Sequence, residues 1–161
     1  MTTVEERHAR AGAGGIADGR GLAAALVLGA AGALVGTRFI ASREALARAA
    51  VKEALVKGHG EDTQSSRVHD IAMGLPWPQQ YPGRALRNAF GDRWRGREAE
   101  LAADAGALRR YREAVAADDP DAVPIWAGED IDLIHEVEPA DAIVATLAAD
   151  AESALALAHA G

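Results

Sequence analysis

The sequence contains no cysteine, which excludes disulfide bonds and thiolate metal sites from this chain. Positive charge is also scarce, since 17 lysines and arginines stand against 24 aspartates and glutamates, for a net charge of −7 and a pI near 5.2. An acidic balance argues against general nucleic-acid binding and suits a soluble cytoplasmic protein. Glu5, Glu6 and Arg7 place charge where a signal peptide would need an apolar run.

Charge is missing altogether from residues 21 to 37, so a membrane span has to be considered. A span needs about 20 consecutive apolar residues. This run is shorter and is interrupted by Gly29, Gly32 and Gly36. A buried helix followed by a buried strand is therefore the better interpretation, and we expect no contact with a membrane.

The segment from Ala13 to Phe39 begins with a glycine turn that can bind an anion. Gly14 and Gly15 tolerate positive φ, so the backbone N–H groups around them can converge on negative charge. A helix is expected from Gly19 to Leu28, with Asp18 as its N-cap. The N-terminus of this helix faces the turn and also favours negative charge.

Residues 32 to 36 are an unbroken apolar run, typical of a strand buried on both faces of a parallel sheet. Gly36 and Thr37 end it with a permissive backbone and a hydroxyl donor. Two such turns on neighbouring parallel strands form a phosphate cup like the one often found after the last two strands of a (β/α)8 barrel. From these residues alone, glycines that serve tight packing in a helix–strand unit are an equally good interpretation.

Three stretches carry a more specific likeness. Residues 14–39, GGIADGRGLAAALVLGAAGALVGTRF, resemble the FMN-phosphate region of nitronate monooxygenases, formerly called 2-nitropropane dioxygenases. Flavin-dependent enoyl-ACP reductases of the same superfamily are similar in this stretch. Residues 74–88, GLPWPQQYPGRALRN, and residues 127–140, AGEDIDLIHEVEPA, resemble later segments of the nitronate monooxygenases and favour that family.

The resemblance implies an α/β protein that is a C-terminal fragment of a (β/α)8 TIM barrel with a mostly helical C-terminal extension. A complete barrel needs about 250 residues, whereas this chain has 161. Residues 1–12 are unmatched and predict a frayed tail or a short helix rather than the strand expected before Gly14. Residues 13–57 would be the last barrel units, 58–120 a helical and loop subdomain on the substrate side, and 121–161 the closing segment and final helix.

The resemblance also implies a cofactor and a reaction. The family uses FMN and O2 to oxidise alkyl nitronates to a carbonyl compound and nitrite, without a metal. The cofactor contacts carried over are Gly14, Gly15, Leu34, Val35, Gly36 and Thr37, with Leu34 and Val35 contributing backbone groups. The family's catalytic histidine lies upstream of the matched region, so no catalytic residue is assigned here.

Several other side chains allow two interpretations. Arg38 either helps to neutralise the phosphate or forms a structural ion pair. His59 has no second histidine at ligand spacing and is expected to be a solvated loop residue. His69 lies next to Asp70 in a short strand or bent segment over residues 67–73, but neighbours in an extended chain point apart, so an acid–base pair is weakly supported. Glu129 stands where the family often has glutamine, which puts that contact in doubt.

The remaining chain is predicted to be largely helical. The expected helices are 42–57 capped by Ser42, 98–117, and 139–158 with Ile143, Leu147, Ala151 and Leu155 inward. Between them, residues 81–98 carry arginines interleaved with aromatics, a composition seen in nucleic-acid patches. The acidic residues within that segment favour internal salt bridges and stacking, so no nucleic-acid partner is expected.

Three hypotheses about function remain. The chain is a truncated nitronate monooxygenase acting on a small-molecule nitronate, a non-enzymatic helical remnant, or a fragment of a flavin-dependent reductase-like barrel. In each case the strand at residues 32–36 has an open side, so we expect self-association through an exposed barrel edge.

Overall fold

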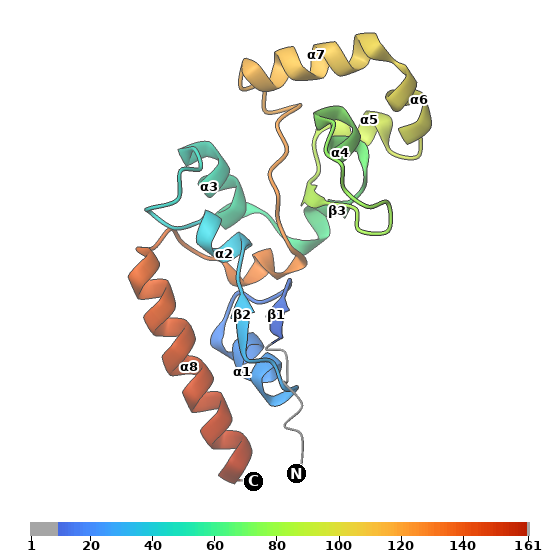
Figure 1. Ribbon diagram of the computed structural model, residues 1–161. Coiled ribbons are helices and arrows are strands. Elements are labelled where there is room, and N and C mark those ends of the chain that lie inside the picture. The colour runs from blue at the N-terminus through green and yellow to red at the C-terminus, as the bar shows by residue number, and fades with distance from the viewer. Residues whose placement is uncertain (1–9, 161) are drawn as a thin grey trace, which may run out of the picture. The chain divides into compact units, whose positions relative to one another are not determined.

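The computed structural model describes residues 10–160 (Figure 1). The chain divides into two compact units. We call residues 10–56 with 133–160 the terminal unit, and residues 57–132 the central unit. Residues 1–9 of the predicted N-terminal tail lie outside the described residues.

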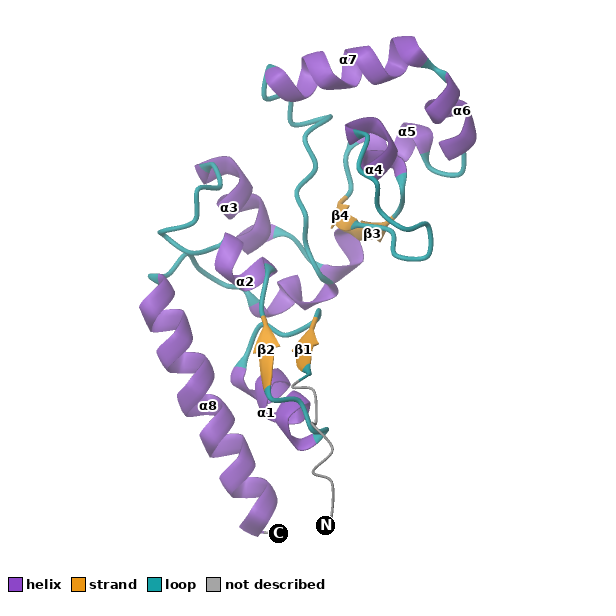
Figure 2. Ribbon diagram, viewed as in Figure 1, coloured by secondary structure: helices purple, strands orange, loops and turns teal. Residues whose placement is uncertain are grey.

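The terminal unit starts with a strand–helix–strand motif (Figure 2). Strands β1 (Ala11–Ala13) and β2 (Gly32–Leu34) are parallel, with Ala13 opposite Leu34. Helix α1 (Gly19–Val27) connects them, as the sequence predicts. Asp18 caps this helix, because its Oδ1 accepts a hydrogen bond from the Gly21 N–H at 2.9 Å. The α/β class is therefore confirmed, although the described residues contain this one parallel pair and no closed barrel.

Strand β1 corrects the prediction that residues 1–12 contribute no strand. Residues 11–13 are Ala-Gly-Ala, so no β-branched side chain indicates a strand. The segment is extended because its backbone pairs with β2, next to a 2.7 Å hydrogen bond from the Ala31 N–H to the Arg10 carbonyl. Gly12 also permits α1 to pack closely, since an added Cβ there would lie 3.0 Å from the Ala25 Cβ.

Strand β2 corrects a second prediction, burial on both faces. The Leu34 side chain is 70% exposed, and the rest of the strand is half-buried. The prediction assumed a sheet covered on both sides. In the described residues this sheet has two strands, and α1 is the helix packed on it.

Two helices follow β2, namely α2 (Thr37–Ile40) and α3 (Ala49–Lys57). The predicted helix from Ser42 is wrong in its first seven residues, since α3 begins at Ala49. The backbone of Ser42 instead forms a parallel bridge with Glu138, and the Arg43 N–H donates to the Glu138 carbonyl at 2.8 Å. This pairing with a distant segment replaces the first turns of the expected helix.

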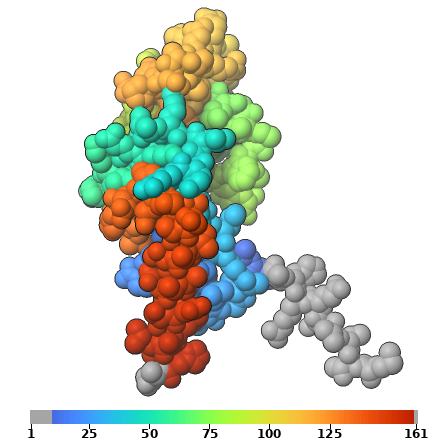
Figure 3. Space-filling view, turned by 90° about the vertical axis from the view of Figure 1, so that its left-hand side faces the viewer, coloured from blue at the N-terminus to red at the C-terminus, as the bar shows by residue number. Residues whose placement is uncertain are grey.

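Helix α8 (Ala140–Ala160) completes the terminal unit and packs along α1. Ile143, Leu147 and Ala151 are buried, as predicted, whereas Leu155, also expected inward, is half-buried. Gly19 marks the closest approach, because a Cβ there would lie 2.4 Å from the Asp150 Cβ. The opposite face of α8 is open (Figure 3). By length and composition alone α8 could cross a membrane, but a single helix of this kind is weak evidence for a span.

The central unit combines one small two-stranded antiparallel sheet with helices. Strands β3 (Thr63–Ser65) and β4 (Arg84–Leu86) pair antiparallel, after a short 3-10 helix η1 (Gly60–Asp62). The helices are α4 (Val68–Met73), α5 (Ala89–Trp94), α6 (Glu98–Ala103), α7 (Ala105–Ala116) and the 3-10 helix η2 (Glu129–Leu133). Residues 67–73, left open between a strand and a bent segment, thus form a helix, which ends at Gly74 in the left-handed conformation.

Helices α4 to α7 enclose the core of the central unit. Its buried residues are Val68, Ala72, Trp94, Leu101, Ala107, Tyr111 and Ala122. The single helix predicted for residues 98–117 is two helices. Asp104 separates them, because its Oδ1 accepts a hydrogen bond from the Ala107 N–H at 2.8 Å and so caps α7.

Candidate functional site

The two predicted turns lie next to each other at one edge of the parallel pair. Gly14 and Gly15 follow directly after β1, and Val35 and Gly36 follow directly after β2. Because Ala13 is opposite Leu34 in parallel register, both turns leave the sheet at its C-terminal edge. The sequence prediction that these turns meet is therefore satisfied by the strand register.

The backbone at this edge is open to a ligand. Gly14 and Gly15 have φ values of 84° and 69°, which glycine adopts readily. A Cβ added at Gly14, Gly15 or Gly36 would meet nothing within 4 Å. Outside helices and strands, the backbone hydrogen bonds described for residues 10–160 do not use the N–H groups of these glycines. Backbone N–H groups presented in this way suit an anionic oxygen ligand.

Helix α1 begins next to this edge and has a negatively charged side chain, Asp18, at its N-terminus. Partial burial tends to raise the pKa of Asp18, but hydrogen bonds from the Gly21 N–H and the Arg20 side chain outweigh this and lower the pKa. The ionised Asp18 thus occupies the N-terminus of α1. At this end, the anion-binding capacity lies in the glycine turn rather than in the first turn of the helix.

Arg38, on α2, takes the structural alternative of the two predicted. Its buried guanidinium forms an ion pair with the Glu138 carboxylate and donates to the Glu136 carbonyl at 3.2 Å. Both partners lie in the segment before α8. The residue therefore ties α2 to that segment.

The remaining residues of the predicted phosphate cup, Leu34, Val35 and Thr37, lie close to Gly36 in the sequence. Leu34 is exposed, and Val35 and Thr37 are half-buried. Thr37 begins α2 immediately after the second turn. The donors brought together here are backbone amides and one hydroxyl, a set whose chemistry fits a phosphate ester.

A pocket that the sequence did not predict lies elsewhere in the terminal unit. It has a volume of about 290 Å³. It is bounded by the start of α1, the Arg38 side chain, residues 133–138 and α8. Asp18, Glu136, Glu138 and Asp150 outnumber Arg20 and Arg38 among its lining residues. The acidic lining makes this pocket a poor place for a phosphate.

The structure shows the surroundings of His59, which the sequence predicts to be a solvated loop residue. His59 is exposed, and its Nδ1 lies 3.0 Å from the Asp132 carboxylate. Hydrogen bonds from the Gly60 N–H and from His59 lower the pKa of Asp132. In the described residues, no group of three or more metal-binding side chains comes together.

His69 and Asp70 do not form a pair with each other. The buried His69 directs Nδ1 at the Tyr111 hydroxyl, 3.3 Å away, while Asp70 accepts from the Gly83 N–H at 3.1 Å. Burial lowers the pKa of His69, with a smaller opposing effect from Asp70, and burial raises the pKa of Tyr111 to about 12. Sequence reasoning missed the His69–Tyr111 contact, because no local spacing connects residues 42 positions apart.

The arginines of residues 81–98 engage acids and an aromatic ring, as predicted. Arg87 pairs with Asp92 at 3.1 Å, and Arg97 pairs with Glu100 at 2.7 Å. Arg93 and Arg97 both stack on Trp94. Glu129, the departure from the family pattern, pairs with Arg84 at 2.9 Å.

Comparisons with known proteins agree with these observations. The family model described as nitronate monooxygenase matches residues 11–150. A nitronate monooxygenase of Neurospora crassa is 35% identical over 144 residues, which cover 87% of this chain and 37% of that protein. The structure of FabK from Thermotoga maritima has a TM-score of 0.72 at 29% identity, covering 92% of this chain and 45% of FabK. A nitroalkane oxidase from Streptomyces ansochromogenes has a TM-score of 0.67 at 29% identity, covering 88% of this chain and 39% of that one.

The fold and these matches place the chain in the class of α/β proteins. Within that class, the chain belongs to the nitronate monooxygenase family. It spans about two fifths of the length of the relatives described above.

Proposed function

We propose that the terminal unit is the FMN-phosphate site of a nitronate monooxygenase. The observation that carries this proposal is the pair of open glycine turns at the C-terminal edge of two parallel strands. Family membership supports it independently. The site is thus proposed from backbone geometry and from descent together.

Each cup residue has a defined part in this proposal. The N–H groups at Gly14, Gly15 and Gly36 donate to phosphate oxygens, with Thr37 at the start of α2 beside them. Leu34 and Val35 contribute backbone groups. FMN bound there supplies the electron transfer by which O2 oxidises an alkyl nitronate to a carbonyl compound and nitrite. No catalytic base is assigned within this chain.

We further propose that residues 11–57 form the last units of a (β/α)8 barrel. The likeness to FabK and to the nitroalkane oxidase supports this, as does the strand–helix–strand order. Because the chain covers 37% of its Neurospora relative, the complete reaction is proposed for the assembled barrel. We place that enzyme in the cytoplasm, consistent with an acidic chain that lacks cysteine.

The open edge of the parallel pair also suggests how copies of the chain behave. Val27, Leu28 and Leu34 are 68%, 88% and 70% exposed. Unpaired edges and exposed apolar side chains promote association. We propose self-association through this edge, and a concentration-independent monomer in sedimentation velocity would contradict it.

The cofactor proposal is tested by comparing FMN with riboflavin, which lacks the phosphate. Titration calorimetry on the purified chain should show FMN binding at least about tenfold more tightly, the effect of one or two charge-assisted hydrogen bonds. Gly15→Asp should remove this preference by placing a carboxylate beside the phosphate. Equal binding of the two flavins, or binding of neither, would overturn the proposal.

Gly29→Asp is the matched control. Gly29 also has a positive φ, 93°, and an added Cβ there also meets nothing within 4 Å. It follows α1 and precedes β2, so it lies at the opposite end of the strand pair from the cup. This variant bears the same backbone cost and the same charge, and it should retain the preference for FMN.

The likeness to FabK favours a second candidate, a flavin-dependent reductase of the enoyl-ACP reductase type. The two candidates differ in reductant. A nitronate monooxygenase releases nitrite from an alkyl nitronate without NAD(P)H, whereas a reductase consumes NAD(P)H and releases none. Nitrite assays with and without NAD(P)H on the assembled, flavin-loaded barrel distinguish them.

A further inference from the structure

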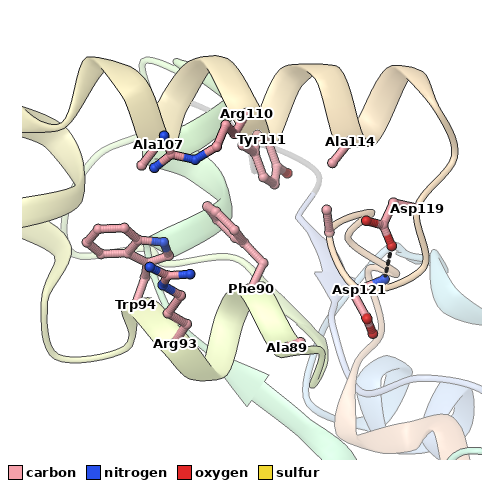
Figure 4. A pocket seen from close by; sticks show the side chains of 11 residues that line it. Ala89, Phe90, Arg93, Trp94, Ala107, Arg110, Tyr111, Ala114, Asp119 and Asp121 are labelled. Atoms are coloured by element: carbon pink, nitrogen blue, oxygen red, sulfur yellow. Dashed lines mark hydrogen bonds between the residues drawn. The ribbon is translucent and has the colours of Figure 1, made fainter.

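The central unit contains a pocket that the flavin proposal does not use. It lies between α5 and α7 and is closed at one end by the turn that follows α7 (Figure 4). Its volume is about 240 Å³. Phe90, Trp94 and Tyr111 line it, and the rings of Phe90 and Tyr111 lie 4.5 Å apart between centroids, tilted by 38°. These three rings form an aromatic floor for a small ligand.

Two arginines lie at the Trp94 end of this pocket (Figure 4). The Arg93 guanidinium stacks 5.7 Å from the centroid of Trp94. Arg110 folds back toward the first turn of α7, since its Nη1 would lie 3.2 Å from a Cβ at Gly106. Within residues 10–160, neither guanidinium has a hydrogen bond or ion pair with an acidic side chain. Two unpaired guanidinium groups beside an aromatic floor suit a ligand carboxylate.

The opposite end of the pocket is formed by a strained turn. Asp118 has a φ of 61°, the one positive φ of a residue other than glycine in the described chain. The Asp118 N–H donates to the Val115 carbonyl and the Asp119 N–H to the Ala114 carbonyl, so α7 ends in a Schellman motif. The turn brings Asp119 into the pocket wall, away from the arginines (Figure 4). Asp121, whose N–H donates to the Asp119 carboxylate, lines the same end. The two aspartates and the two arginines therefore lie at opposite ends of the pocket (Figure 4).

We propose that this pocket binds a small carboxylate with an apolar, preferably aromatic, body. The carboxylate lies against Arg93 and Arg110, and the body lies on the rings of Phe90, Trp94 and Tyr111. This site belongs to the central unit and is independent of the flavin proposal. If the chain does not bind FMN, binding of the carboxylate can still be tested, and the reverse also holds.

The probe is 3-phenylpropanoate, compared with its neutral amide, 3-phenylpropanamide. In ¹H–¹⁵N NMR titrations of the whole chain, the carboxylate should shift the resonances of α5 and α7 and bind at least about tenfold more tightly than the amide. The preference should weaken as salt is added. Equal binding of the two probes, no binding at millimolar concentration, or shifts confined to residues outside α5, α7 and the turn at residues 117–122 would each overturn the proposal.

Three variants sharpen the test. Arg110→Gln should weaken the carboxylate about tenfold and leave the amide unchanged. Ala114→Leu should weaken both probes, because the larger side chain fills the pocket. Arg112→Gln is the matched control, since Arg112 is an exposed arginine on the same helix and does not line the pocket. If Arg112→Gln weakens the carboxylate as much as Arg110→Gln, the binding is general electrostatic attraction and the proposal is wrong.

Discussion

The terminal and central units of this chain are built from different residues. The terminal unit has glycine and alanine at its closest contacts, as where Gly19 meets Asp150 and Ala151. The central unit is packed around rings, and six of the seven aromatic residues lie there, namely Trp77, Tyr81, Phe90, Trp94, Tyr111 and Trp126.

Because of this difference, the two units form their candidate sites in different ways. In the terminal unit, small residues let backbone groups approach a ligand, so the candidate flavin site consists mainly of N–H groups. In the central unit, large side chains enclose a pocket and charged ends line it. Substitutions should therefore act through added volume in the first unit and through lost volume in the second.

The largest effect is expected from removing volume in the central unit. Leu101 is fully buried in its core, and Leu101→Ala should lower the free energy of unfolding by about 2–5 kcal/mol. Urea denaturation followed by tryptophan fluorescence measures this, because all three tryptophans lie in the central unit. Leu46→Ala, at a fully exposed position, is the control and should leave the midpoint unchanged. A loss below 1 kcal/mol at Leu101 would contradict the comparison.

An intermediate effect is expected from adding volume in the terminal unit. Gly19→Ala places a Cβ 2.4 Å from the Asp150 Cβ and 2.6 Å from the Ala151 nitrogen, so α1 and α8 must separate. We expect a loss of about 1–3 kcal/mol, measured by far-UV circular dichroism melts. On the same helix, an added Cβ at Gly21 makes ordinary contacts of 3.5 Å and longer. Gly21→Ala should therefore stabilise by up to about 1 kcal/mol, and destabilisation of equal size by both changes would disprove the packing argument.

The smallest effect is a pH dependence of the central unit. Burial lowers the pKa of His69 below its ordinary value of 6.5, so the unfolded chain takes up a proton before the folded one does. Stability should be full above pH 6.5 and should decline as the pH falls from there toward the lower folded pKa. His69→Gln can still hydrogen-bond the Tyr111 hydroxyl and should reduce this decline, as judged from urea midpoints at pH 7.5 and 5.5. An unchanged decline would assign it to other groups.

Local patterns in the sequence predicted much of this fold. The capping of α1 by Asp18 and the inward face of α8 depend on residues a few positions apart, so they are visible in the sequence. The two turns of the predicted cup could also be found, because Gly14–Gly15 and Gly36–Thr37 are visible in the sequence itself. Whether FMN binds there stays a prediction.

Features that depend on distant partners could not be predicted. The strand at Ala11–Ala13 is extended only because β2 pairs with it. Ser42 does not start a helix, since it pairs with Glu138, which lies far along the chain. The aromatic pocket combines α5, α7 and a turn, and no spacing along the sequence indicates that these three segments meet.

Helix α8 has fully buried side chains only along its first part. Its 21 residues extend about 31 Å at 1.5 Å per residue, and the last buried side chain is Ala151. Beyond that point Ala154 and Leu155 are half-buried and residues 156–159 are exposed. The last turn therefore depends on its own backbone hydrogen bonds, which short helical segments maintain poorly in water. We therefore expect this last turn to fray first, and amide protection along α8 should be lowest at its C-terminal end.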